Sequence, residues 1–151
     1  MSKVKLRNGD DHLEAAGKHL LDAKALISLQ RADGAAYLSG YVVECAIKTL
    51  LLLEVGWQPG HKTPWERGAV GHDLNDLASK LAALSTVATS KTARYIGVET
   101  SKVSASAIAG WNPQMRYRPE AVALPDSQAW VQIAEAVYRE TVEKMRIDGV
   151  L

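Results

Sequence analysis

The sequence predicts an all-α domain, an up-and-down antiparallel bundle of four to five helices. Apolar residues recur every three or four positions along most of the chain, the spacing that lines up one face of a helix. No stretch alternates with period two over a useful length, and no Asn-Gly or Asp-Gly pair lies between β-rich segments. One short connection followed by longer loops is typical of such a bundle.

The first helix is expected over residues 11–29. Asp11 is placed to cap it, and Glu14, three residues later, completes a capping-box-like pair. One apolar face runs along this segment and consists of Leu13, Ala16, Leu20, Ala23 and Ile27. Residues 30–34 break the pattern over a length short enough to return the chain antiparallel.

The second helix is expected over residues 34–55, with Asp33 as its cap. Its apolar residues cover more than one face, which predicts a central position in the bundle. Glu44 and Lys48 lie four residues apart and can pair along this helix. We favour an internal ion pair that fixes helix packing, and the alternative is a polar lining of a cavity at a bundle or dimer seam.

The rest of the chain alternates between loops and helices. Residues 56–71 form a connection with four Gly and two Pro, and residues 72–84 return to helical spacing. Residues 86–110 are expected to form a weaker helix, in two pieces broken near Gly97. Residues 111–125 contain three Pro and are expected to be irregular. Asp126 or Ser127 is then expected to cap a last helix that ends near residue 147, with Trp130, Ile133, Val137, Thr141 and Met145 as its stripe.

Composition limits the class of protein. A chain of 151 residues is the length of one domain, and its formal net charge of +1 argues against a strongly basic nucleic-acid coat. The single cysteine, Cys45, cannot form an intramolecular disulfide, and no phosphate-binding glycine loop occurs. The first residues lack the apolar core of a signal peptide, and the longest apolar run is Leu50 to Leu53. We therefore expect a cytoplasmic protein without membrane span, metal or cofactor.

Residues 36–51, with the sequence AYLSGYVVECAIKTLL, resemble the signature helix of the HEPN (higher eukaryotes and prokaryotes nucleotide-binding) domain family. Residues 12–25 are similar to the first helix of the family, residues 71–74 to the His-Asp-Leu that opens its next helix, and residues 111–119 to a Trp…Arg-Tyr segment before its last helix. These pieces occur in the order of the family. They cover residues 10–147, so the whole of residues 1–151 is interpreted as one HEPN-like domain.

The resemblance implies a bundle that usually forms homodimers and acts near nucleotides or RNA. Some members of the family partner a minimal nucleotidyltransferase, often in toxin–antitoxin pairs. Others are metal-independent ribonucleases with an Arg-x4–6-His motif contributed by both chains of the dimer, and others again have lost this motif.

Arg67 and His72 have the spacing of that motif and are the candidate catalytic residues. The histidine would move a proton at the ribose 2′-hydroxyl or at the leaving oxygen, and the arginine would stabilise charge on the phosphate. Two observations argue against catalysis. Gly68 and Gly71 interrupt the segment, and His72 can equally be a structural or capping residue at the start of the next helix.

Arg116, Tyr117 and Arg118 are the candidate nucleotide or phosphate site. Two guanidinium groups around an aromatic ring suit a phosphate and a stacked base. Residues 86–119 hold five Lys and Arg against the single acidic residue Glu99. The alternative is structural, with these arginines paired to carboxylates on neighbouring helices and Tyr117 packed against the bundle.

Other reactive side chains favour structural interpretations. Cys45 is expected to be a small buried hydrophobic residue whose pKa is raised by Glu44. His12 and His19 lie two turns apart, and without nearby carboxylates they are expected at the surface rather than at a metal. Trp57, Trp65 and Trp111 fall in the irregular segments and are expected to anchor loops to the bundle.

Three functions remain open from the sequence. The first is a homodimeric module that binds a nucleotide or RNA, or docks a nucleotidyltransferase, in a toxin–antitoxin or stress and defence system. The second is a metal-independent endoribonuclease that uses Arg67 and His72. The third is a plain interaction protein. The Arg67–His72 motif is displaced from the helical region that it occupies in the family and is interrupted by glycines. This favours the first function over the second.

Overall fold

A computed structural model describes residues 4–6, 10–58, 61–65, 71–86, 90–119 and 122–151. The described residues contain helices, turns and loops and no strand, which confirms the predicted all-α bundle. The longer helices are α1 (His12–Ser28), α2 (Ala32–Glu54), α3 (Leu74–Ser85) and α5 (Leu124–Tyr138). The last of these continues without a break through a π-helical turn, η5 (Arg139–Glu143), into α6 (Lys144–Ile147).

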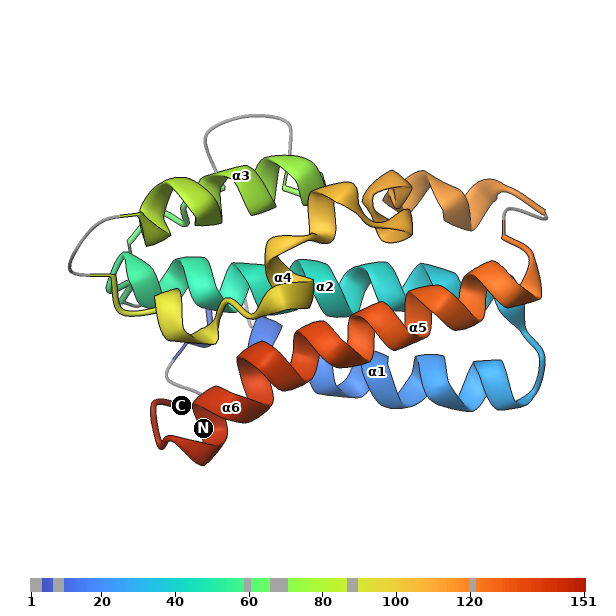
Figure 1. Ribbon diagram of the computed structural model, residues 1–151, viewed down its shortest axis with the longest axis horizontal. Helices are drawn as coiled ribbons and strands as arrows, with labels where there is room; N and C mark the ends of the chain where they lie inside the picture. Colours follow the sequence, from blue (N-terminus) through green and yellow to red (C-terminus); the bar gives the residue numbers. More distant parts are fainter. Residues whose placement is uncertain (1–3, 7–9, 59–60, 66–70, 87–89, 120–121) are drawn as a thin grey trace.

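Helix α2 is the centre of the bundle, as its apolar faces predicted. It contacts α1, α3 and α5, and most of its residues between Ala35 and Leu52 are buried. Figure 1 shows α3 and the short helices that follow α4 along one side of α2, with α1 and α5 along the other and α4 next to α5. Burial on several sides removes apolar surface from water all around this helix, which makes it the main source of the core.

By length and composition, α2 is the one described helix that could cross a membrane. In the most apolar window of this helix, however, 78% of the residues are buried inside the bundle.

The helix starts differ from the predicted caps at two places. Asp11 does cap α1, because its carboxylate accepts a hydrogen bond from the Glu14 backbone N–H at 3.2 Å. Asp33 does not cap α2, since the helix begins earlier, at Ala32, and the Asp33 carboxylate instead accepts from the Val122 N–H at 2.8 Å.

The start of the last helix was also predicted wrongly. Helix α5 begins at Leu124, with Pro125 in its first turn, so Asp126 and Ser127 lie inside the helix rather than before it. Proline fits there because the first helical N–H groups have no intrahelical partner. The Ser127 hydroxyl donates instead to the Ala32 carbonyl at 2.6 Å and joins the starts of α5 and α2.

The segment between α3 and α5 is more broken than predicted. Residues 86–110 were expected as two weak helices, and the described part forms four short pieces. These are η1 (Ala93–Tyr95), α4 (Val98–Ser101), η2 (Val103–Ala105) and η3 (Ala107–Gly110). Gly97 does mark a break, between η1 and α4. A fifth piece, η4 (Pro113–Tyr117), lies in the segment expected to be irregular, where Asn112 caps it by accepting from the Gln114 N–H.

Candidate functional site

One face of α2 is polar and aromatic although the helix is otherwise apolar. Tyr37, Tyr41, Glu44 and Lys48 follow one another at steps of four, three and four residues, which places them along a single stripe. The stripe meets His19 of α1, Trp65 in the loop after α2, His72 just before α3, and Trp111.

Glu44 is the charged centre of this stripe. Its carboxylate accepts a hydrogen bond from Lys48 Nζ at 2.6 Å, and the side chains of Glu44 and Lys48 are only 3% and 5% exposed. A buried carboxylate is costly unless it is paired, so the ion pair expected from the sequence supplies the necessary partner. Lys48 Nζ also lies 5.0 Å from the centre of the Trp65 ring, which holds the loop against α2.

His72 is the second partner of the Glu44 carboxylate. Its Nδ1 lies 3.0 Å from both Glu44 oxygens, while the His72 side chain is 56% exposed. The Nδ1–H group donates to the carboxylate. The other ring nitrogen, Nε2, then carries the lone pair that can accept a proton. A fixed carboxylate that orients an imidazole in this way is the arrangement used by general bases.

The capping role that the sequence left open for His72 is wrong. Asp73 caps α3, since its carboxylate accepts from the backbone N–H groups of Asn75 at 2.8 Å and Asp76 at 3.1 Å. Asp73 therefore fixes the start of the helix, and the His72 side chain is left to contact α2.

Two tyrosines connect His72 to Arg116. The Tyr41 ring meets the His72 ring edge-on, with 6.4 Å between their centres, and the Tyr37 and Tyr41 hydroxyls lie 3.2 Å apart. The Arg116 guanidinium contacts the Tyr37 and Tyr117 hydroxyls, which raises its pKa, and lies 4.8 Å from the centre of the Tyr117 ring. We call these five residues the His72–Arg116 array.

Trp111 fixes the array against α2. Its Nε1 donates to the Tyr37 carbonyl at 2.9 Å, and its ring meets Tyr41 edge-on with centres 4.8 Å apart. The ring is 2% exposed and crosses α2 at Gly40, where a side chain would collide with it. This contact confirms the anchoring role expected for Trp111. Burial raises the pKa of Tyr41, so this phenol stays neutral and uncharged beside the histidine.

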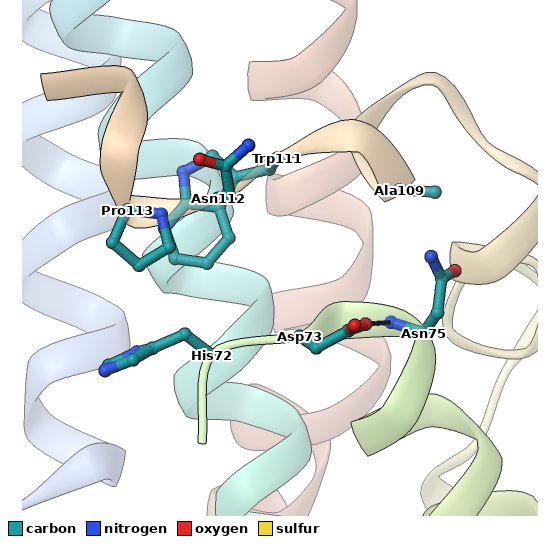
Figure 2. Close-up of a pocket in the computed structure, with 7 residues that line it drawn as sticks. All are labelled: His72, Asp73, Asn75, Ala109, Trp111, Asn112 and Pro113. Atoms are coloured by element: carbon teal, nitrogen blue, oxygen red, sulfur yellow. Dashed lines mark hydrogen bonds between the residues drawn. The ribbon is translucent and has the colours of Figure 1, made fainter. Parts of the chain in front are cut away.

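A hollow of about 240 Å³ adjoins His72. Figure 2 shows that it opens between the start of α3 and the segment that follows η3, with Trp111 and Asn112 on one side and Asp73 and Asn75 on the other. Its walls combine an aromatic ring with amide groups, which suits a planar polar ligand. The other residues around it are Ala109 and Pro113.

The three residues of the predicted phosphate site do not point the same way. Arg116 reaches the tyrosines of α2, and Tyr117 is 71% exposed beside it. Arg118 lines a different hollow, together with Trp130 and Asp126 of α5. The structure thus associates Arg116 with His72, whereas it places Arg118 elsewhere. Arg67, the predicted partner of His72, lies outside the described residues.

The two histidines of α1 are half-buried, whereas they were expected at the surface. His12 packs edge-on against Trp65, with 5.2 Å between ring centres, and burial, reinforced by the charge of Lys48, lowers its pKa to about 4. Burial also lowers the pKa of His19, which packs on Tyr41. Cys45 is buried as expected, and burial, with a smaller effect of Glu44, raises its pKa to about 12. This thiol is therefore a poor nucleophile.

Within the described ranges, no group of three or more His, Cys, Asp and Glu is arranged to hold a metal ion. Comparison of the chain with protein-family models, with curated proteins and with solved structures finds no significant match.

Sequence reasoning missed Tyr37 and Tyr41 as parts of a site, and it treated Glu44 and His72 as separate features. The available signal was the spacing of Tyr37, Tyr41, Glu44 and Lys48, which puts polar groups on one stripe of a helix that is otherwise apolar. No spacing along the chain could show that His72, 28 residues after Glu44, would meet the same carboxylate.

Proposed function

We propose that this chain is a HEPN-like module that binds a nucleotide or an RNA phosphate at the His72–Arg116 array. The observation that carries the proposal is the association of an exposed guanidinium, Arg116, with an oriented imidazole, His72, through two tyrosines. An arginine binds a phosphate through paired charge-assisted hydrogen bonds. The exposed ring of Tyr117 offers a surface on which a base can stack.

Charge supports a phosphate rather than a cationic ligand at this place. Glu44 is neutralised by Lys48, and Arg116 adds a positive charge to the array. The arrangement therefore favours an anion near Arg116 and His72.

A second function, a metal-independent endoribonuclease, is favoured by one specific contact. The 3.0 Å contact between Glu44 and His72 Nδ1 fixes the imidazole with Nε2 free to take a proton. In this reaction Nε2 would remove the proton of the ribose 2′-hydroxyl, and the resulting oxygen would form a bond to the phosphorus. The bond between the phosphorus and the 5′-oxygen would break, and the 5′-oxygen would take a proton from water. An arginine would stabilise the phosphate, a role for which Arg116 and Arg67 are the two candidates.

The resemblance to the HEPN family also underlies our proposals about assembly. We expect a symmetric homodimer in the cytoplasm, and a nucleotidyltransferase as a candidate partner in a toxin–antitoxin or defence setting. A twofold dimer would use the same patch on both chains. Light scattering that finds a particle of 16.4 kDa, the mass of a single chain, at micromolar concentration would contradict the dimer.

Binding is tested with a fluorescent single-stranded RNA titrated at several salt concentrations. The affinity of the parent should fall as salt rises, and Arg116→Ala should weaken binding by about 1–3 kcal/mol through loss of a charge-assisted contact. Arg139→Ala is the matched control, because Arg139 is an exposed arginine already paired with Glu135 on α5. Equal affinities of the parent and Arg116→Ala would refute this site.

Cleavage is tested separately, with purified protein and RNA in EDTA. If the second function holds, the parent cleaves and His72→Ala does not, provided that circular dichroism shows the same folded state for both. Arg67→Ala and Arg116→Ala then identify the arginine that serves the phosphate. If the parent does not cleave RNA, the endoribonuclease function is excluded and only the binding function remains. Cleavage by His72→Ala would exclude this histidine as the base.

A further inference from the structure

Three side chains of the candidate site form one chain of contacts around a single carboxylate. Lys48 Nζ lies 2.6 Å from Glu44 Oε1, and both oxygens of the same carboxylate lie 3.0 Å from His72 Nδ1. The side chains of Lys48 and Glu44 are almost fully buried, whereas that of His72 is exposed. The ammonium therefore acts on the imidazole through a carboxylate that both of them contact.

Lys48 is held in this place by the loop that leads to His72. Its Nζ lies 5.0 Å from the centre of the Trp65 ring. A Cβ built on Gly71, the residue before His72, would lie 3.9 Å from Lys48 Nζ and 3.8 Å from the Trp65 ring. The chain thus passes beside the ammonium directly before it reaches the histidine.

The other titratable groups that face Glu44 from α1 and α2 are neutral. Burial lowers the pKa of both histidines of α1, that of His12 to about 4, so these imidazoles carry no charge at neutral pH. Burial raises the pKa of Tyr41 and of Cys45, which keeps the phenol and the thiol protonated. Among the described residues, Lys48 is the one permanently charged cation that contacts the Glu44 carboxylate.

The remaining charges of this region are exposed. Asp10 interacts electrostatically with His12, and Asp73 directly follows the histidine of the site. Arg116 is likewise exposed and contacts the tyrosine hydroxyls. Water and salt screen exposed charges much more than buried ones, so the buried ammonium of Lys48 acts most strongly on the carboxylate.

A proton added to the Glu44–His72 pair has two places to bind. A protonated carboxyl group would donate to Nδ1, and the hydrogen of the neutral imidazole would then lie on Nε2. A protonated imidazole carries hydrogens on both ring nitrogens. In either case Nε2 holds a hydrogen, so its lone pair is free only while the pair has not taken up this proton.

Lys48 opposes the uptake of that proton. With Lys48 present, an ionised Glu44 and a neutral His72 bring the charge of the three side chains to zero, and a further proton would leave a positive charge at a buried place. Without Lys48 the pair would be a buried negative charge, which the same proton would neutralise.

We propose that Lys48 is a positioning residue that keeps His72 Nε2 free of hydrogen at neutral pH, so that this nitrogen accepts a hydrogen bond or a proton from a ligand. The use of Nε2 toward RNA rests on the proposed function. The state of Nε2 itself is measured without any ligand, so failure of this proposal and failure of RNA binding are separate outcomes.

The experiment is a long-range proton–nitrogen NMR spectrum of the isotope-labelled parent protein at pH 8. A ring nitrogen that carries a hydrogen and one with a free lone pair differ widely in nitrogen chemical shift, and His72→Gln identifies the His72 signals by their absence. We expect a hydrogen on Nδ1 and a free lone pair on Nε2. A hydrogen on Nε2 in the parent would overturn the proposal without any variant of Lys48.

Three substitutions separate the charge of Lys48 from its other contacts. Lys48→Met removes the charge and keeps a long side chain, Lys48→Gln also keeps a hydrogen-bond donor for Glu44, and Lys48→Arg keeps the charge. Circular dichroism selects the variants that keep the parental fold, and Lys48→Gln carries the test if Lys48→Met does not fold. Nε2 should gain a hydrogen in both uncharged variants and stay free in Lys48→Arg. A free lone pair on Nε2 in a folded uncharged variant would refute the role of the charge, and so would a hydrogen on Nε2 in Lys48→Arg.

Discussion

The substitution Gly40→Ala should destabilise this protein although alanine has a higher helix propensity than glycine. Gly40 is buried in the middle of α2, and a Cβ there would lie 2.1–2.2 Å from three atoms of the Trp111 ring. Ordinary contacts begin at 3.4 Å, so the ring must move by about 1.3 Å or leave its site. Helix α2 cannot move away instead, because it is packed against α1, α3 and α5.

Two opposing terms set the size of the effect. Replacing glycine with alanine inside a helix gains about 1 kcal/mol. Displacing the Trp111 ring forfeits its burial and its hydrogen bond to the Tyr37 carbonyl, a loss comparable to the roughly 3–5 kcal/mol of a Trp→Ala change in a core. The net expectation for Gly40→Ala is a loss of about 2–4 kcal/mol in the free energy of unfolding.

The measurement is urea unfolding followed by far-ultraviolet circular dichroism and tryptophan fluorescence. Gly34→Ala is the matched control in the same helix, because the atom nearest to its Cβ would be a Leu26 methyl group, at 3.1 Å, on a side chain that can rotate away. The sharper test repeats Gly40→Ala in a Trp111→Ala background, where the same substitution should stabilise by about 1 kcal/mol. If Gly40→Ala stabilises the parent protein as well, the packing argument for Trp111 fails.

Three further outcomes are expected. Asp73→Ala removes the cap of α3 and should cost about 1 kcal/mol in urea unfolding, whereas Asp73→Asn, which can still cap, should cost less. Glu44→Gln leaves the Lys48 ammonium buried without a counter-charge and should lower the free energy of unfolding by about 3–5 kcal/mol. The double variant Glu44→Gln/Lys48→Met should recover most of this loss. Equal stability of the single and the double variant would contradict the buried pair. The folded-state pKa of His12, about 4, lies below its unfolded value of 6.5. The free energy of unfolding should therefore fall by about 3 kcal/mol as the pH drops from 6.5 to 4. His12→Gln should flatten the dependence of the free energy of unfolding on pH in this range.

The long helices could be predicted from the sequence because their causes are local. Residues 11–29 carry their own cap, Asp11, and their own apolar face, and α1 spans His12–Ser28. The last stripe, from Trp130 to Met145, likewise lies on a helix that ends at Ile147. The expected Glu44–Lys48 pair forms because both residues lie on one helix, one turn apart.

The predicted cap at Asp126 failed for a local reason, because α5 begins earlier, at Leu124, with Pro125 in its first turn. The predicted cap at Asp33 failed because a contact distant in the chain competed with the local rule. Asp33 accepts from the Val122 N–H, 89 positions away, so its carboxylate joins α2 to the segment before α5 and does not start a helix. The short helices of residues 93–117 also lie beyond prediction, because each is too short to be stable by itself and depends on its packing against the bundle.

The sequence by itself determined that this chain is a helical bundle, which segments form its long helices, and which residue types could meet a phosphate. Only the tertiary structure decided that Glu44 meets His72, that Tyr37 and Tyr41 connect His72 to Arg116, and that Arg118 turns toward a separate hollow. The physical reason is the range of the forces that act. Caps and helix periodicity depend on residues a few positions apart, whereas a site depends on which distant side chains share one buried charge or one aromatic contact after the helices have packed.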